Sequence, residues 1–312
     1  MKKISIITPC FNEEDNVENC IDGVSRIMLE KLPHYSYEHI FTDNASTDRT
    51  VEIIKSRALV DSRVKLTVNS RNVGPFRNMW NGLKKSKGEL VIPMLPADLQ
   101  DPPIVIPEFV KKWEEGNLIV YGVRRNRQES FFMRAIRSIY YRVIQKLADF
   151  PIPRDAGEFM AIDRSVADSL LKLKDEYPYI RGLVAQVGVK SSYVTYTWEK
   201  RYSGKSKNSI LDLVDQGVNG LISTSKVPAR LALVSGFAIS LLSIIYAFAQ
   251  IIILSINRNG APIGIPTLIV SITFFAGIQL LFLGLIGEYV LSIHNQVRPA
   301  PPMYEIESIN LD

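Results

Sequence analysis

Residues 88–103 read GELVIPMLPADLQDPP, and this stretch decides which fold the chain can adopt. Its first half is an apolar run of the length expected for a buried β-strand. Asp98, Gln100 and Asp101 follow where that strand should stop, and two prolines then end the regular structure. Because ligands bind at the carboxyl ends of strands in open α/β sheets, the stretch predicts a ligand site.

Asp98 and Gln100 are the residues of this stretch that we expect to bind a metal ion. On an extended backbone, residues two apart point to the same side. Their oxygen atoms suit Mg²⁺ or Mn²⁺ that is held partly by the phosphates of a substrate. A capped turn before a helix would use the same residue types, so this prediction depends on the rest of the chain.

Predicted strands alternate with predicted helices around this stretch. Runs of apolar and β-branched residues at 4–8, 39–42, 64–68 and 118–123 predict further strands, and segments with helical spacing lie between them. This alternation argues for a parallel sheet with right-handed crossovers. We therefore expect a Rossmann-like α/β fold that binds a nucleotide.

Polar residues follow two more of these strands. Residues 43–50, DNASTDRT, are rich in side chains that cap helices and bond nucleoside hydroxyls. Arg124, Arg125 and Arg127 come at the end of another strand, where they would suit phosphate oxygens, although a solvated loop can have the same composition.

Two later segments carry the remaining polar candidates. Asp155 and Glu158 place carboxylates on either side of Gly157, and the strand-like residues 160–162 follow them. Residues 201–207, RYSGKSK, form a glycine-containing loop with three cations, which can close over an anionic substrate.

Composition limits the classes of partner. The net charge is only +5, from 37 Lys+Arg against 32 Asp+Glu, and we expect no nucleic-acid partner. Cys10 and Cys20 are too few for a disulfide framework or a metal cluster, so we expect reduced, buried thiols in a cytosolic domain. The N-terminal apolar run is too short for a signal peptide and predicts a first strand.

Two uncharged segments, residues 231–256 and 267–287, each exceed the ~20 residues needed to span a bilayer. They predict a transmembrane hairpin, with a buried hairpin of a soluble protein as the alternative. Cations flank its outer ends, at Lys226, Arg230 and Arg298, and by the positive-inside rule both termini should be cytoplasmic.

The predicted organisation has four parts. They are an α/β domain at residues 1–208, an interfacial helix at 209–230, the hairpin at 231–290 and a cytosolic tail at 291–312. A basic amphipathic segment at 131–150 would lie in the membrane interface or pack on the sheet.

These motifs, in this order, resemble the inverting family-2 glycosyltransferases of GT-A fold. The resemblance is to the branch that transfers sugars to polyprenyl phosphates, which includes dolichol-phosphate mannose synthase and the bactoprenol glucosyltransferases. It covers nearly the whole chain, through the segments PCFNEE (9–14), DNASTD (43–48), NVG (72–74), ADLQDPP (97–103), YGVR (121–124), GEF (157–159), RYSGKSK (201–207) and GEY (287–289).

The resemblance implies a role for each candidate residue. The nucleotide base and ribose would be held by Pro9, Phe11, Glu13 and Asp43. The metal bridging the diphosphate would be bound by Asp98 and Gln100. Phosphates of donor and acceptor would be bound by Arg124, Arg127, Arg201, Ser206 and Lys207. The catalytic residues would be Asp98, Asp155 and Glu158, with Glu158 at the sugar either as a base or as an orienting group.

The implied reaction moves a sugar from a UDP- or GDP-type donor to a polyprenyl phosphate. It would need Mg²⁺ or Mn²⁺, invert the anomeric centre and occur at the cytoplasmic membrane face, in a protein that we expect to be a homo-oligomer. Pro96 stands where the family usually has an aspartate, and this departure supports the alternative of a catalytically impaired membrane scaffold. A processive polysaccharide synthase is a weaker alternative, because the chain lacks a Gln-x-x-Arg-Trp motif.

Overall fold

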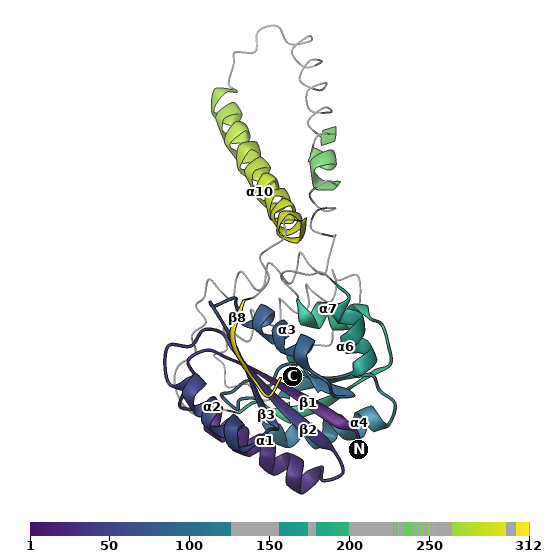
Figure 1. Ribbon diagram of the computed structural model, residues 1–312. Helices are drawn as coiled ribbons and strands as arrows, with labels where there is room; N and C mark the ends of the chain where they lie inside the picture. The colour runs from purple at the N-terminus through teal and green to yellow at the C-terminus, as the bar shows by residue number, and fades with distance from the viewer. Residues whose placement is uncertain are drawn as a thin grey trace.

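Eight strands of the described chain form one sheet, in the order β7-β5-β6-β4-β1-β2-β3-β8 (Figure 1). This computed structural model describes residues 1–125, 156–173, 179–199, 264–297 and 304–311, with scattered positions between 227 and 252. The strands are β1 (Lys3–Cys10), β2 (Ser36–Asp43), β3 (Val64–Asn69), β4 (Leu90–Ile92), β5 (Ile119–Arg125), β6 (Ala156–Asp163), β7 (Ser191–Thr197) and β8 (Glu305–Ile309).

Helices cover both faces of the sheet, as the strand sequences require. Ile6 and Ile7 of β1 are both fully buried, but they point to opposite faces and belong to two separate hydrophobic clusters. One face is covered by α1 (Val17–Lys31), α2 (Thr50–Val60) and α4 (Ile106–Glu114), which follows the 3-10 turn η1 (Pro103–Val105). The other face is covered by α3 (Pro75–Lys85), α6 (Arg164–Leu171) and α7 (Ile180–Gln186) (Figure 1).

The sheet is mixed and mostly parallel. β1 pairs in parallel with β2 and β4, β2 with β3, and β5 with β7. β6 runs antiparallel to both β4 and β5, and β8 runs antiparallel to β3. The prediction of an α/β fold is therefore confirmed, with two antiparallel strands that the alternation of strands and helices did not indicate.

The central strand is shorter than the apolar run that predicted it. β4 contains only Leu90–Ile92, because Pro93 has no N–H to continue the ladder. The chain stays close to β1 beyond this point, since Leu95 donates a hydrogen bond from its main-chain N–H to the Ile7 carbonyl, at 2.8 Å. The apolar run thus delivers the following polar segment beside the end of β1.

The C-terminal residues return to the sheet as β8, although the sequence indicated only an extended tail. Ion pairs from α3 and α2 hold this strand, with Lys85 2.7 Å from Glu305 and Lys55 2.6 Å from Glu307. Asn310 then donates two hydrogen bonds to the carbonyls of Ala58 and Val64. β8 is therefore held at the end of the sheet by contacts from helices on both faces.

The long helix α10 (Ile265–Val297) extends away from the sheet (Figure 1). Its segment Phe274–His294 is the one helix in the described ranges that is long and apolar enough to cross a membrane. Apolar side chains on it are exposed, such as Leu280 at 69%. The predicted first span at 231–256 lies largely outside the described residues, and the segments at 131–150 and 209–226 lie wholly outside them.

Candidate active site

Six strands bring their polar ends to one edge of the sheet. β1, β2 and β4 are parallel neighbours, and β5 and β7 run in the same direction because β6 is antiparallel to both β4 and β5. The carboxyl ends of these five strands and the beginning of β6 therefore meet. The sequence predicted candidate residues at most of these positions, and the topology explains why they converge.

The loops after β1 and β2 are joined into one surface by hydrogen bonds. The Asn12 N–H donates to Ser46 Oγ at 2.8 Å, and the Thr47 N–H donates to Asn12 Oδ1 at 2.7 Å. Asn12 and Ala45 both have left-handed backbone conformations, with φ of 53° and 62°. Such strain in non-glycine residues persists only where surrounding contacts hold it, and it is concentrated at functional sites.

The predicted nucleotide residues lie at this surface, with differing exposure. Pro9, Phe11 and Glu13 are half-buried, whereas Asp43 is fully buried. The Asp43 carboxylate accepts hydrogen bonds from the main-chain N–H of Ser46, at 2.8 Å, and from its hydroxyl, at 2.5 Å. Burial raises the pKa of Asp43, and these bonds partly oppose the shift. In this structure Asp43 orders the loop, and its contact with a nucleotide stays a prediction.

Asp98 and Gln100 lie in a turn, and the extended backbone that we expected at these two residues is absent. The Leu99 N–H donates to the Pro96 carbonyl at 3.3 Å, and Leu99 has a φ of 57°. The Asp98 carboxylate accepts a hydrogen bond from the Gln100 N–H at 3.2 Å. Both side chains are half-buried at the edge where the strand ends meet.

A complete protein metal site is absent from the part of the chain that the structure describes. No group of three His, Cys, Asp or Glu side chains there could hold an ion. Asp98 and Gln100 offer two hard oxygen donors, which fit a metal ion that takes its remaining ligands from substrate phosphates and water. The donor set is therefore compatible with Mg²⁺ or Mn²⁺ bound together with a substrate.

Arg124, at the end of β5, is held by a buried carboxylate that the sequence analysis did not assign. Its Nε and Nη2 atoms donate to the two oxygens of Asp101, at 2.9 Å and 2.5 Å. Tyr196 of β7 donates its hydroxyl to Asp101 at 2.6 Å. Burial by itself lowers the pKa of Arg124, but Asp101 outweighs burial and the pKa is raised above its ordinary value.

The beginning of β6 packs directly on this arginine. A Cβ atom at Gly157 would lie only 3.0 Å from Cζ of Arg124, so a glycine lets the guanidinium approach the strand. Glu158, the next residue, forms an ion pair with Arg181 of α7 at 2.9 Å. Arg181 also donates to the Ala156 carbonyl at 3.0 Å, which fixes its position at the start of the strand.

Sequence reasoning thus missed Asp101, Tyr196 and Arg181 as members of this edge. For Tyr196 a signal was present, because SSYVTYT at 191–197 is a run of β-branched and aromatic residues typical of a strand. Asp101 lies in the same segment, residues 97–103, as Asp98, and only its burial in the folded chain distinguishes it from Asp98. Five predicted residues lie outside the described chain, namely Arg127, Asp155, Arg201, Ser206 and Lys207.

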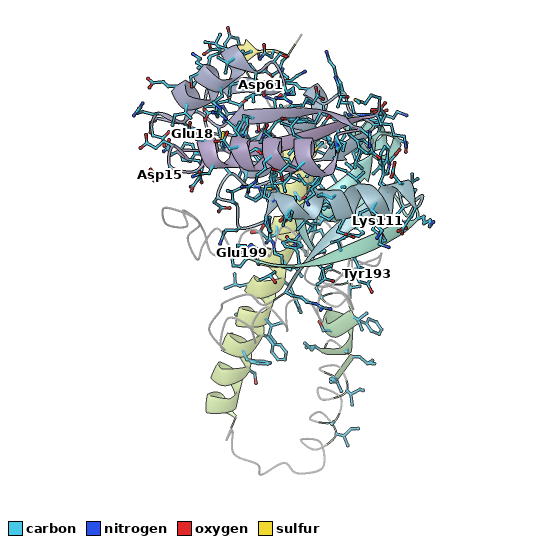
Figure 2. All side chains as sticks on the ribbon, turned by 90° about the horizontal axis from the view of Figure 1, so that it is seen from below. Asp15, Glu18, Asp61, Lys111, Tyr193 and Glu199 are labelled. Carbon is cyan, nitrogen blue, oxygen red and sulfur yellow. The ribbon has the colours of Figure 1, made fainter. Side chains whose placement is uncertain are left out.

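Three side chains labelled in Figure 2 are exposed and lie on the helical side of the sheet, namely Asp15 just before α1, Glu18 in its first turn and Lys111 on α4. Cys10 and Cys20 are buried and not joined in a disulfide, as expected from the sequence.

Comparisons with known proteins show which family the chain belongs to. The chain is 34% identical to the uncharacterized glycosyltransferase YkcC of Bacillus subtilis (strain 168), covering 95% of this chain and 91% of that one. It is 31% identical to the bactoprenol glucosyl transferase of Shigella phage SfX, covering 98% and 99%. The crystal structure of a mycobacterial protein shares the fold, with a TM-score of 0.50 at 19% identity over 71% and 73% of the two chains. Residues 5–171 match the family described as Glycosyl transferase family 2, and the chain belongs to that family.

Proposed function

We propose that the protein transfers a sugar from a nucleotide-sugar donor to a polyprenyl phosphate at the cytoplasmic face of a membrane. The observation that carries the proposal is full-length similarity to a bactoprenol glucosyl transferase, which extends through the apolar C-terminal segments as well as the α/β domain. A relationship confined to the nucleotide-binding half would have indicated a donor but no acceptor.

The donor would bind across the carboxyl ends of β1, β2 and β4. Pro9, Phe11 and Glu13 line the surface formed by the first two loops, and Arg124 brings a permanent positive charge to the other side of Asp98 and Gln100. To bind a nucleoside diphosphate, a site needs a surface with apolar and polar groups for the nucleoside. It also needs cations for the phosphates. This edge of the sheet supplies both.

Asp98 and Gln100 are the residues that would hold a divalent metal ion. When bound, Mg²⁺ or Mn²⁺ would neutralise charge on the departing nucleoside diphosphate. Pro96 adds no acidic ligand, so this site would depend more strongly on substrate phosphates than a site with two carboxylates.

The pairing of β8 with β3 supports a membrane hairpin. β8 follows α10 in sequence and lies in the same sheet as the N-terminal strands, so both must be on one side of a membrane. If α10 crosses the membrane, a second crossing must bring the chain there, and the uncharged segment at 231–256 is long enough to provide it. The acceptor would then reach the site from the bilayer.

In the proposed reaction, a phosphate oxygen of the acceptor attacks the anomeric carbon of the donor sugar. The new carbon–oxygen bond forms as the bond to the diphosphate breaks, which inverts the anomeric centre and releases a nucleoside diphosphate. The acceptor phosphate is already anionic near neutral pH, so the step does not require a strong general base. Glu158, fixed by Arg181, would orient the sugar hydroxyls.

The test is turnover by the purified full-length protein in detergent, with undecaprenyl phosphate, Mg²⁺ or Mn²⁺ and a panel of nucleotide sugars. We expect free nucleoside diphosphate and a glycolipid of matching mass, both abolished by chelator. Asp98→Ala should lower turnover at least about 100-fold, since the lost ligand stabilises charge that develops at the leaving group.

Two outcomes would contradict the proposal. Transfer to water or to a soluble sugar, but not to the lipid, would agree with glycosyltransferase activity and would contradict the proposal of a polyprenyl phosphate acceptor. Binding of nucleotide sugars without turnover of any of them would favour the scaffold alternative, and Pro96→Asp should then be tested for restored activity.

A further inference from the structure

Asp101 is a fully buried carboxylate one residue beyond Gln100, and the proposed reaction gives it no direct part. It receives hydrogen bonds from Arg124 and from Tyr196, three in total, at 2.5–2.9 Å. We call these three residues the Asp101 cluster. Asp101 comes from the loop at residues 96–102, named the motif loop below, whereas Arg124 ends β5 and Tyr196 lies in β7. Burying an anion without partners is very costly, so the two donors are required by the carboxylate.

The cluster determines which edge of the Arg124 guanidinium faces the site. Arg124 uses Nε and one proton of Nη2 on Asp101, so Nη1 and the second Nη2 proton point away from that carboxylate. Gly157 packs against the guanidinium, and the ring centroid of Trp198 lies 5.6 Å from its Cζ atom. The side chain is therefore held in one orientation.

The same cluster ties the motif loop to the strands. Arg124 and Tyr196 are directly paired in the register of β5 and β7. Glu199, labelled in Figure 2 beyond the end of β7, donates its N–H to the Gln100 carbonyl at 3.0 Å. The loop that carries Asp98 is thus fastened to β7 through its main chain and through the Asp101 side chain.

We propose that Asp101 and Tyr196 are positioning residues that aim Arg124 at the diphosphate of the donor and hold it at a set distance from Asp98 and Gln100. The inference rests on the proposed function, because it assumes a nucleoside diphosphate at this edge. It adds that the arginine acts as a preorganised ligand whose orientation depends on a buried carboxylate and a tyrosine hydroxyl.

The ionisation of the cluster is consistent with this role. Burial and the nearby carboxylate raise the pKa of Tyr196, so its hydroxyl stays protonated and donates. Arg124 stays charged at any ordinary pH. The cluster therefore keeps one arrangement of donors and acceptors across the pH range in which an enzyme is assayed.

The test uses equilibrium dialysis with the full-length protein in detergent. It measures the binding of UDP and GDP in the presence of Mn²⁺ and, separately, the binding of the nucleosides uridine and guanosine. Tyr196→Phe should weaken binding of the diphosphate about 10-fold and Asp101→Asn about 100-fold, as expected for loss of hydrogen bonds to charged groups. Binding of the nucleoside should change less than about 2-fold, because the cluster acts on the phosphates.

A double-mutant cycle separates positioning from a general structural effect. In an Arg124→Gln background, Tyr196→Phe should cause no further loss of diphosphate binding, because its effect passes through the arginine. Tyr121→Phe, in the buried part of β5, is the matched control and should leave the affinity unchanged. Thermal unfolding identifies any variant that fails to fold, and Tyr196→Phe, which removes no charge, keeps the test valid if Asp101→Asn does not fold.

The outcomes distinguish the two proposals. If the wild-type protein binds neither UDP nor GDP, the proposed function fails and the inference fails with it. If the wild-type protein binds one of them and Tyr196→Phe weakens the diphosphate and the nucleoside equally, or adds its full effect in the Arg124→Gln background, the inference alone is overturned.

Discussion

Gly157 shows how a single residue without a side chain can determine the site. Its missing Cβ gives the Arg124 guanidinium room against β6, while Asp101 holds that guanidinium from the side. The arginine cannot move away from a new methyl group without losing the Asp101 hydrogen bonds. Glycine is therefore needed at position 157 for a steric reason, because a side chain there would collide with Arg124 of the neighbouring strand β5.

We predict that Gly157→Ala will weaken binding of the nucleoside diphosphate and destabilise the protein by about 1–3 kcal/mol, as expected for overpacking. Thermal unfolding and equilibrium dialysis with UDP or GDP would measure the two effects. Gly23→Ala in α1 is the control, because its Cβ would meet only Pro103 Cγ at an ordinary 3.7 Å. The control should be neutral or stabilising by up to about 1 kcal/mol, and equal losses in both variants would contradict the explanation.

A second prediction concerns the ion pair between buried Glu38 and half-buried Lys65, whose charged atoms are 2.8 Å apart. Burial by itself raises the pKa of Glu38, but bonds from Lys65, Ser5 and the Lys87 main chain outweigh it, and the pKa is lowered. A lowered folded-state pKa means that the ionised carboxylate stabilises the fold above its ordinary value of 4.5. This contribution is lost as the pH falls through the folded-state value.

Glu38→Gln should therefore reduce the free energy of unfolding by about 3 kcal/mol at pH 7, the lower end of the range for breaking a buried ion pair. The difference from wild type should stay constant between pH 6 and 8 and shrink below about pH 4.5. Denaturant unfolding at several pH values checks this, and a difference that grows toward acid pH would contradict the sign.

At the scale of elements, β7 and β8 are the strands that the sequence analysis did not predict. β7 has an edge position and exposes Tyr193 at 68%, which blurs the alternation of buried and exposed residues. β8 is only five residues long, and two of them are glutamates whose partners, Lys85 and Lys55, are remote in sequence. Strands held by distant ion pairs carry little local signal.

Asn310 should be a main anchor of β8, and its two roles can be separated by substitution. Asn310→Gly removes the side-chain bonds to Ala58 and Val64 but keeps the left-handed backbone with φ of 58°. We expect it to cost about 1–2 kcal/mol, and Asn310→Ala to cost about 1 kcal/mol more because alanine resists that conformation. Thermal unfolding in detergent measures both, and equal losses would mean that the backbone conformation contributes nothing.

At the scale of the whole molecule, β8 makes the sheet and the apolar segments interdependent. The chain leaves the α/β part, passes through α10 and then pairs again with β3. If α10 and a second segment span a membrane as proposed, two chain connections and not one would join the sheet to that membrane. Such a double connection would hold the edge that carries Arg124 and Asp98 at a limited range of heights above a lipid acceptor.

We predict that cysteines introduced at the exposed residues Ser62 and Ser308 will be labelled from the same side of the membrane. In intact cells, a membrane-impermeant maleimide should label neither, and permeabilisation should expose both. The wild-type protein is the control, because its two cysteines are buried. Labelling of Ser308→Cys alone in intact cells would contradict both the hairpin and the pairing of β8 in the membrane-bound protein.

The alternation of strands and helices, the polar residues at the strand ends, the apolar segments and the resemblance to family-2 glycosyltransferases could all be predicted from the amino-acid sequence. Each of these is a local pattern, set by the period of hydrophobic residues or by a short motif. The antiparallel placement of β6 and β8, the turn at Asp98 and the burial of Asp101 against Arg124 and Tyr196 became visible only in the folded chain. These depend on contacts between residues far apart in sequence, such as Asp101 and Tyr196, which are 95 positions apart, and no local pattern encodes such contacts.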